Sequence, residues 1–227
     1  MRKFKNRNSG TLKSHSVASM LSRMVILAGC VGLSACVSLL PDPEPADLVY
    51  RIDSNVNFVE AAPNAPSLRI DRPTVAIALR GRDIILSQAD RSLSVASGAM
   101  WADDIPTLVQ RSLFDTLGGQ ADIVGVLPNS GARPQYRMSV NVLKFEALFD
   151  QGQSNAPLAI VSYSTVLSDA STRKLLGTFS TTKSVRALEG RVSSIVNAKS
   201  QANAQAMDDI KLWLSSKIGS AKYAAVN

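Results

Sequence analysis

The residues most able to carry chemistry are those of the tetrapeptide Leu33–Cys36, which follows a basic leader and an apolar run. Leu-Ser-Ala-Cys has the form of a lipobox, in which a signal peptidase cleaves before the cysteine and the cysteine carries lipid. Residues 1–23 hold six basic side chains and no acidic one, and residues 24–35 are mostly apolar, which is the order expected of a secretory leader. The sequence therefore predicts export of a bacterial lipoprotein that is lipidated at Cys36.

The sequence offers two alternatives to this interpretation. Leu27–Cys30 is also a lipobox, but it leaves an apolar run of only six residues, 24–29, which is shorter than the usual length of about 7–15. An uncleaved membrane helix over residues 24–40 would have 17 residues, at the short end of the roughly 17–25 that span a bilayer, and glycines and serines dilute it. Both comparisons favour Cys36.

A Pro-rich spacer follows the lipobox and, with Cys36, forms a tether over residues 36–47, because its three prolines oppose helix formation. Fully extended, the 11 residues after Cys36 reach about 35 Å from a membrane surface. We therefore divide the chain into a signal peptide (1–35), this tether, and one folded domain (48–220) that is large enough to bury its own core.

Removal of the leader also removes most of the apparent basicity. Six of the 25 Lys and Arg lie in residues 1–35 and none of the 18 Asp and Glu do, which leaves 19 basic residues against 18 acidic ones. Such a balance provides no general attraction for nucleic acid. The only histidine, His15, and Cys30 are also lost with the leader, so the exported domain cannot build Ser-His-Asp or Cys-His catalysis or a common zinc site. We expect no enzyme, no metal site and no cofactor.

Four short motifs could still carry chemistry. Ser171–Lys174 and Ser180–Lys183 match Ser-x-x-Lys, but two matches in one Ser-rich stretch show how common the pattern is, and neither has the strand-to-helix setting of the penicillin-recognising enzymes. Asp103–Asp104 could act as a carboxylate pair, yet this position favours capping of a helix. Asp208–Asp209 is interpreted as a solvated helix face. A Ser-Lys envelope enzyme, resting on Lys174 or Lys183, is the weakest function hypothesis.

The two tryptophans are candidates for contacts outside the core. Trp101 precedes a predicted helix, and this position favours stapling of the helix start onto the core over a contact with a partner or lipid. Trp213 lies in the predicted C-terminal helix and fits either the core or a docking face. Met100, Met138 and Met207 are expected to fill gaps in the core.

Periodicity and turn residues predict the elements that must position these groups. Alternating apolar residues predict strands, with a break or a sheet edge at Pro73, and apolar residues at a spacing of 3.6 predict two principal helices. The expected strands are Leu48–Ile52, Ser67–Leu79, Asp83–Leu86, Leu93–Ala96, Ile123–Val126, Tyr136–Phe149, Leu158–Leu167 and Leu175–Val185.

The first helix should begin with an Asp cap, tolerate Pro106 in its first turn and end at Gly118–Gly119. The second should run from Arg191 to about Ile218. The predicted buried faces are Ile105, Leu108, Val109, Leu113 and Leu117 in the first helix, and Val192, Ile195, Val196, Ala202, Ala206, Ile210 and Leu214 in the second.

The last three strands are expected to form an antiparallel meander, joined by turns at 150–153 and 169–172. Within the first of them the apolar residues switch parity at Val142 and Leu143, which predicts a β-bulge or burial of both faces. Residues expected to share one face are Val161, Tyr163 and Leu167 in the second strand, and Leu175, Phe179 and Val185 in the third. The predicted fold class is α/β, with a single mixed, largely antiparallel sheet and both helices packed on it.

An ordered set of residues resembles a known family. After the lipobox and its tether come Val49–Ile52, a Trp-Ala pair at Trp101–Ala102 before the first helix, Tyr136–Val140 at the start of a long strand, and an Ala-rich last helix from Asn197 to Leu214. In this order they resemble the ABC-type transport auxiliary lipoproteins, the companions of Mce-type lipid transporters of the Mla and Pqi kind. The chain departs from the family at Met100, where an arginine is frequent, and over Leu79–Leu93, which matches loosely.

The resemblance implies a fold similar to the TolB N-terminal domain and a Gram-negative envelope setting. It also implies partners on separate chains, namely a permease, an ATPase and an Mce-domain protein, and it transfers no catalytic residue. It leaves a homo-oligomer open. Val37, rather than Asp, follows Cys36, and the enteric sorting rule then favours the outer membrane.

Two main hypotheses for function follow. The first is a lipid-anchored docking or scaffold component of an Mce-type system for phospholipid transport between membranes. The second is a periplasmic lipid-binding carrier, which would need an apolar pocket between the sheet and the C-terminal helix, lined by side chains such as Phe145, Tyr163 and Ile210.

The lipobox assignment gives a direct prediction. Cys36→Ala should abolish incorporation of radiolabelled fatty acid into the protein in cells, because the acyl chains need the thiol of that residue. A variant that still takes up label would contradict the assignment of the anchor to Cys36.

Overall fold

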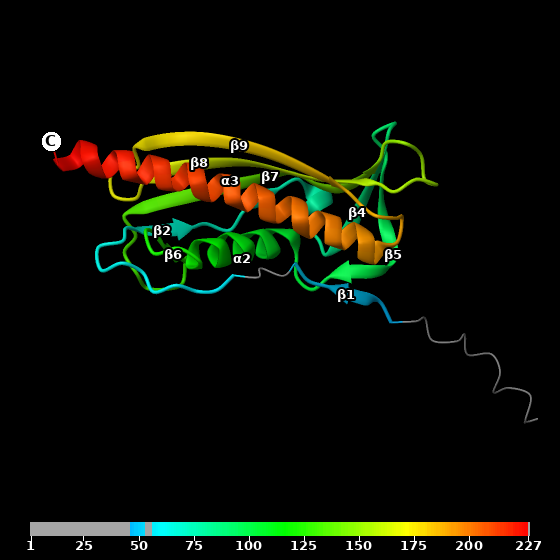
Figure 1. Ribbon diagram of the computed structural model, residues 1–227, viewed down its shortest axis with the longest axis horizontal. Helices are drawn as coiled ribbons and strands as arrows, with labels where there is room; N and C mark the ends of the chain where they lie inside the picture. The colour runs from blue at the N-terminus through cyan, green and yellow to red at the C-terminus, as the bar shows by residue number, and fades with distance from the viewer. Residues whose placement is uncertain (1–45, 53–55, 227) are drawn as a thin grey trace, which may run out of the picture. The chain divides into compact units, whose positions relative to one another are not determined.

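The computed structural model describes residues 46–52 and 56–226, with side chains as far as Ser220 (Figure 1). The lipobox, with Cys30 and Cys36, lies outside the described residues, so lipidation stays a prediction. The described strands, which form one nine-stranded sheet, are β1 (Leu48–Tyr50), β2 (Ser67–Ile70), β3 (Thr74–Val75), β4 (Asp83–Gln88), β5 (Leu93–Trp101), β6 (Val124–Val126), β7 (Tyr136–Phe149), β8 (Leu158–Asp169) and β9 (Leu175–Arg186). The described helices are the 3-10 turn η2 (Ile77–Leu79), α2 (Ile105–Gly118) and α3 (Val192–Val226).

Strand β7 is the centre of the sheet. Along one edge it pairs in parallel with three short strands in succession: β2, β3 and β4. Along the other edge it pairs with β8, which pairs in turn with β9, and both of these pairings are antiparallel. Beyond β4 the sheet continues through β5 to β1, and beyond β2 it ends at β6. The long ladders of the predicted meander therefore dominate a mixed sheet, and the predicted fold class is confirmed.

The segment predicted as one strand from Ser67 to Leu79 is divided in the structure. β2 ends at Ile70, the buried Pro73 interrupts the ladder, and only β3 resumes pairing before the chain turns into η2. Since proline has no N–H to donate to a neighbouring strand, it separates the two short pairings with β7. The predicted break at Pro73 is confirmed.

The phase change in β7 is a β-bulge. The register with β8 shifts between Val142 and Lys144, so Leu143 is the extra residue, and it is half exposed. Val142 before the bulge and Phe145 after it are both buried. Of the two explanations that the sequence left open, the bulge is correct, because the extra residue lets the apolar side chains of both halves of the strand point toward the helices.

The last strand differs from the prediction at its start. The register between β8 and β9 shifts by one residue there, so Leu175 is 59% exposed while its neighbour Leu176 packs against the core. The expectation that Leu175 shares the face of Phe179 and Val185 is wrong, because an extra residue reverses the alternation. Phe179 and Val185 do pack against the core.

Both helices lie on one face of the sheet (Figure 1). All five residues of the predicted α2 stripe are buried. In α3 six of the seven predicted residues are buried, and the seventh, Val192, is half-buried against the core. The helix continues past the predicted end near Ile218 to Val226. Alanines on its buried face, such as Ala202 and Ala206, let its backbone approach the sheet closely.

Helix α2 begins as predicted. Asp104 is the N-cap, and its Oδ1 accepts a hydrogen bond from the Thr107 N–H at 2.8 Å. Its Oδ2 pairs with the Arg72 guanidinium, so a single carboxylate caps the helix and ties it to the loop after β2. Pro106 occupies the first turn, where its missing N–H has no effect, and the helix ends at Gly118 and Gly119.

This cap supports a prediction about stability. Asp104→Ala should lower the free energy of unfolding by about 1 kcal/mol, because it leaves helix N–H groups unsatisfied. Asp104→Asn keeps the acceptor and should lose only the exposed ion pair, a few tenths of a kcal/mol. Urea unfolding measures both values, with Asp103→Ala as the matched control, since Asp103 is exposed. Equal losses in Asp103→Ala and Asp104→Ala would contradict the role of the cap.

Candidate functional site

A fully buried lysine lies where α3 meets the sheet. Lys199 has no exposed surface, and its Nζ donates to the backbone carbonyls of Ile85 at 3.0 Å and Phe145 at 3.5 Å. The rings of Trp101 and Phe145 have their centroids 5.7 and 5.6 Å from the same nitrogen, within the range of cation–π contacts. One amine thus joins the last helix to β4, β5 and β7.

Burial lowers the pKa of Lys199 to about 7, because removal from water disfavours the charged ammonium, and the negative charge of Glu146 opposes the shift. The ammonium therefore releases its proton near neutral pH, unlike an exposed lysine. The burial of Lys199 was not predicted from the sequence. Its spacing was the available clue, since Lys199 lies between Val196 and Ala202 on the predicted buried face, but a charged residue is normally assigned to the surface.

A second set of buried polar groups connects both helices to the sheet. The Tyr163 hydroxyl on β8 donates to Asn203 Oδ1 on α3 at 2.7 Å, and Asn203 Nδ2 donates to Ser112 Oγ on α2 at 3.2 Å. Burial also raises the pKa of Tyr163, so the phenol stays neutral and available as a donor. Because unpaired buried polar groups are costly, this chain of bonds fixes how α3 is placed between α2 and β8.

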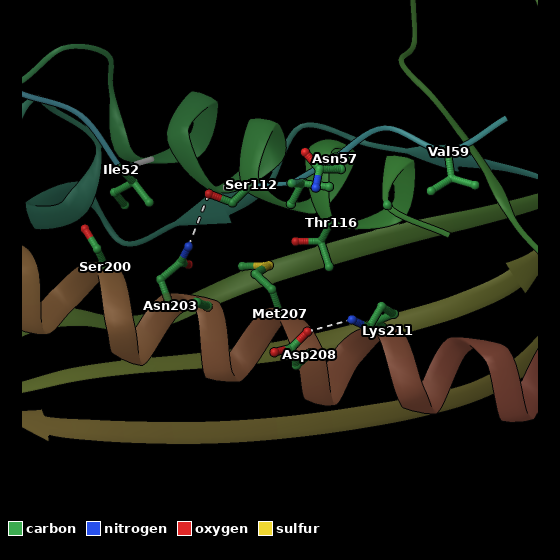
Figure 2. A pocket seen from close by; sticks show the side chains of 13 residues that line it. Ile52, Asn57, Val59, Ser112, Thr116, Ser200, Asn203, Met207, Asp208 and Lys211 are labelled. Atoms are coloured by element: carbon green, nitrogen blue, oxygen red, sulfur yellow. Dashed lines mark hydrogen bonds and ion pairs between the residues drawn. The ribbon is translucent and has the colours of Figure 1, made fainter. Parts of the chain in front are cut away.

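Ser112 and Asn203 both line a cavity that α2 and α3 form together with residues that follow β1, and Figure 2 shows the bond between them. The cavity has a volume of about 560 Å³ and its lining is mixed, with hydroxyl and amide groups beside Met207 and the aliphatic Ile52 and Val59. Lys211 donates to Asp208 at 2.7 Å at its rim. The other lining residues are Val56, Asn57, Thr116, Gly119, Ser200 and Ala204.

The cavity is not where the carrier hypothesis placed a pocket. Phe145 and Tyr163 are 0% exposed and Ile210 is 1% exposed, so these side chains present no surface to a cavity that would admit even water. Side chains fill the space between the sheet and α3, and the expectation of a pocket lined by these three residues is wrong. The cavity forms instead where α2 and α3 lie side by side.

The two predicted acidic pairs are structural. Asp103 is exposed and Asp104 caps α2. Asp208 is solvated as predicted, but Asp209 turns toward β9 and accepts from Thr181 at 2.6 Å and from Lys183 at 2.8 Å. These bonds, that from Lys183 first, hold the pKa of Asp209 below its usual value. The prediction of a solvated face is therefore wrong for Asp209.

The two Ser-x-x-Lys motifs do not present a serine to a lysine. Ser171 donates its hydroxyl to Asp169 at 2.8 Å in the turn before β9, and Lys183 is held by Asp209. Ser180 and Lys183 are three residues apart on one strand, so their side chains point to opposite faces of the sheet. Each motif thus has one of its two groups engaged elsewhere.

The tryptophans take different places. Trp101 is fully buried with its ring edge-on to Phe145 at 5.7 Å, which confirms a role in the core. Trp213 stacks on Phe179 of β9, with centroids 5.4 Å apart, and is only partly buried. Among the methionines, Met138 and Met207 are buried and Met100 is half-buried.

Over the described part of the chain, no group of three or more His, Cys, Asp or Glu side chains is arranged to hold a metal ion. No helix in that same part combines the length and apolar character needed to cross a membrane.

Lys199 makes stability depend on pH with a defined sign. Between the folded pKa of about 7 and the ordinary 10.5, the unfolded chain binds more protons, so stability rises with pH. Compared with Lys199→Met, the wild type should gain up to about 1.4 kcal/mol per unit from about pH 7 to 9.5. Urea unfolding across this range measures the gain. The range ends at about pH 9.5 because tyrosines of the unfolded chain begin to ionise above it.

The matched control is Lys174→Met, which removes an exposed lysine and should give a curve parallel to that of the wild type. If the Lys199→Met curve also ran parallel to the wild-type curve, the low pKa would be refuted.

The chain is similar to a known protein family and to solved structures. Residues 50–211 match the model of the family described as the ABC-type transport auxiliary lipoprotein component. The crystal structure of protein XCC0632 from Xanthomonas campestris, of family model DUF330, is 17% identical with a TM-score of 0.67, over 77% of this chain and 99% of that chain. The crystal structure of an uncharacterized protein is 15% identical with a TM-score of 0.58, over 75% of this chain and 100% of that chain.

At these identities the solved structures show a shared fold alone, and no curated protein matches the chain significantly. The family match covers nearly all of the folded domain, from the end of β1 to the middle of α3. The chain belongs to the family of ABC-type transport auxiliary lipoproteins.

Proposed function

We propose that this chain is a non-enzymatic component of an Mce-type ABC transport system that moves phospholipid between membranes. The folded domain docks on a periplasmic Mce-domain protein, while the permease and the ATPase are separate chains. The observation that carries the transport role is the family match over residues 50–211. The Mce partner and the lipid cargo are our extension of it.

In this proposal the lipid on Cys36 provides membrane residence and the tether provides reach. Each buried CH₂ of an acyl chain contributes about 0.8 kcal/mol, so a di- or triacylated terminus stays on the membrane. Val37 after the lipidated cysteine favours the outer membrane, so the domain holds the distal end of the transporter at that membrane.

We assign docking to the free edge of β9, which borders the sheet in Figure 1. This 12-residue strand pairs only with β8 among the described residues, so its other edge offers backbone N–H and C=O groups. Edge strands are usually protected by charges or prolines. Here Lys183 is bound to Asp209 and Arg186 to Asp150, so the charges of β9 are neutralised. Such an edge suits the addition of a strand from a partner.

Site-specific photo-crosslinking tests the proposal in cells that express the full-length protein and the transporter. A photoreactive residue at Ser180 or Thr182, both exposed on β9, should crosslink to an Mce-domain protein, because docking brings that chain within reach. Gln201 and Gln205, exposed on α3, are the matched control positions and should give little crosslinking.

Crosslinks to the Mce-domain protein from the α3 positions alone would move the docking surface away from β9. A lack of crosslinks from all four positions, in cells where the transporter is present, would overturn the proposal. Cys36→Ala should remove the acyl anchor without removing the β9 crosslinks in detergent extracts, since the anchor and the docking surface are separate.

The cavity between α2 and α3 favours a second candidate function, a lipid-binding carrier. Its volume of about 560 Å³ lies in the range that holds small ligands, about 300–1,000 Å³, although its lining is partly polar. Native mass spectrometry of gently purified full-length protein separates the two functions. Stoichiometric phospholipid in addition to the covalent anchor would favour the carrier, and its absence would favour docking alone.

A further inference from the structure

Two arginines face each other on the sheet surface opposite the helices. Arg69 of β2 and Arg137 of β7 are register partners, and their neighbours Leu68, Ile70 and Met138 are fully buried on the helix side. Because side chains alternate along a strand, the two guanidinium groups lie together on the open face. Like charges placed directly opposite each other destabilise a sheet unless something compensates them.

One carboxylate provides part of that compensation. Asp71 accepts from Arg69 Nε at 3.0 Å through Oδ1, and from Arg137 Nε through Oδ2. Its Oδ2 also accepts from the Ser139 hydroxyl at 3.1 Å. A single negative charge is thus shared by two positive ones, and both oxygens of Asp71 are already occupied.

The remaining donors of this cluster are unused. Each arginine bonds through Nε, and within residues 46–52 and 56–220 no further hydrogen bond engages the terminal nitrogens of either. Thr74 donates to Asn141 Oδ1 at 3.2 Å, which leaves the Asn141 amide N–H groups as donors. These groups line a cavity of about 530 Å³ on the open face, together with Ser164.

The charges around this cavity do not balance among the described residues. Arg72 also lines it, but its guanidinium is tied to Asp104 and Thr107 on α2. After that pair is set aside, Arg69 and Arg137 face Asp71 alone. The cavity therefore combines an excess positive charge with donors that lack acceptors, which is the complement of an oxyanion.

We propose that this cavity, floored by Arg69, Arg137 and Asn141, is a binding site for a phosphate group. The terminal nitrogens of arginine form a planar fork that matches two phosphate oxygens, and such charge-assisted bonds are among the strongest polar contacts in proteins. The cavity is larger than inorganic phosphate, so it also has room for the group that a phosphate ester carries. The same chemistry is offered by a soluble phosphate and by a phospholipid headgroup. The site does not depend on docking at β9.

Isothermal titration calorimetry on the full-length protein tests the site. The protein is kept in dodecyl maltoside, a detergent without phosphate. One arm titrates inorganic phosphate, a second glycerol 3-phosphate, and a third dodecyl maltoside micelles that contain phosphatidylglycerol. Arg69→Gln and Arg137→Gln should each weaken binding by about tenfold or more, because a hydrogen bond to a charged group is lost. Arg80→Gln is the matched control, since Arg80 is exposed and does not line the cavity.

Binding in any arm that both cavity variants weaken and Arg80→Gln does not would support the site. Binding of the soluble ligands alone would identify a free phosphate compound, and binding of the lipid micelles alone would identify a headgroup. No binding in any arm, or binding equally strong in all variants, would overturn the proposal. Acetate is titrated as a control anion, and acetate binding as strong as that of phosphate would also overturn it. Arg69→Lys and Arg137→Lys keep the charge but lose the fork. They should bind more weakly than the wild type. Because these substitutions are conservative, loss of fold is not needed to explain the weaker binding.

Discussion

The pairing of β7 along both of its edges is the constraint on which the rest of the structure depends. Three short parallel strands that follow one another in the chain are aligned because each pairs with a different stretch of this one 14-residue strand. The opposite edge fixes β8 and, through it, β9. A strand of this length twists, and the bulge at Leu143 resets its alternation halfway along. Without that extra residue, Phe145 and the apolar residues after it would face water, and α3 would have only half a surface to pack on.

Polar contacts in the core then fix where α3 lies on that surface. An alanine-rich helix face can slide over a sheet at little cost, because its contacts are shallow and similar at each turn. Lys199 and Asn203 remove this freedom, since each must reach particular partners across the interface. A shift of one turn would leave an amine, an amide and the Tyr163 hydroxyl buried without partners, which is far more costly than the loss of a few apolar contacts. The same specificity makes the helix sensitive to pH, because one of the groups that position it is a lysine with a pKa near 7.

Local patterns were enough to predict α2, the meander and the course of α3. In α2 the Asp104 cap, the apolar stripe and the terminal glycines all agree, so tertiary contacts had nothing to override. Where two equivalent residues adjoin, as at Leu175 and Leu176, periodicity cannot choose which one faces inward, and the ladder with β8 decides. Lys199 was missed because its burial depends on carbonyls of β4 and β7, more than 50 residues away in the chain. The position of the cavity was missed for a related reason, since it arises from how α2, α3 and the segment with Val56, Asn57 and Val59 meet, and not from the composition of any one of them.

The two faces of the sheet meet different physical requirements. On the helix side a polar group without a partner is costly, and Lys199, Tyr163 and Asn203 find partners within the protein. On the open side water can satisfy polar groups, so the exposed Thr178, Ser180, Thr182 and Ser184 of β9 lie there at no cost. The facing pair Arg69 and Arg137 does not follow from solvation alone, because two aligned cations sharing one carboxylate are less stable than an aligned ion pair. An arrangement that gives up stability at one surface position, while Asp71 orients both guanidinium groups, is what a preorganised anion site requires. The face covered by the helices thus specifies the fold, and the open face is where a binding site can be added without disturbing that fold.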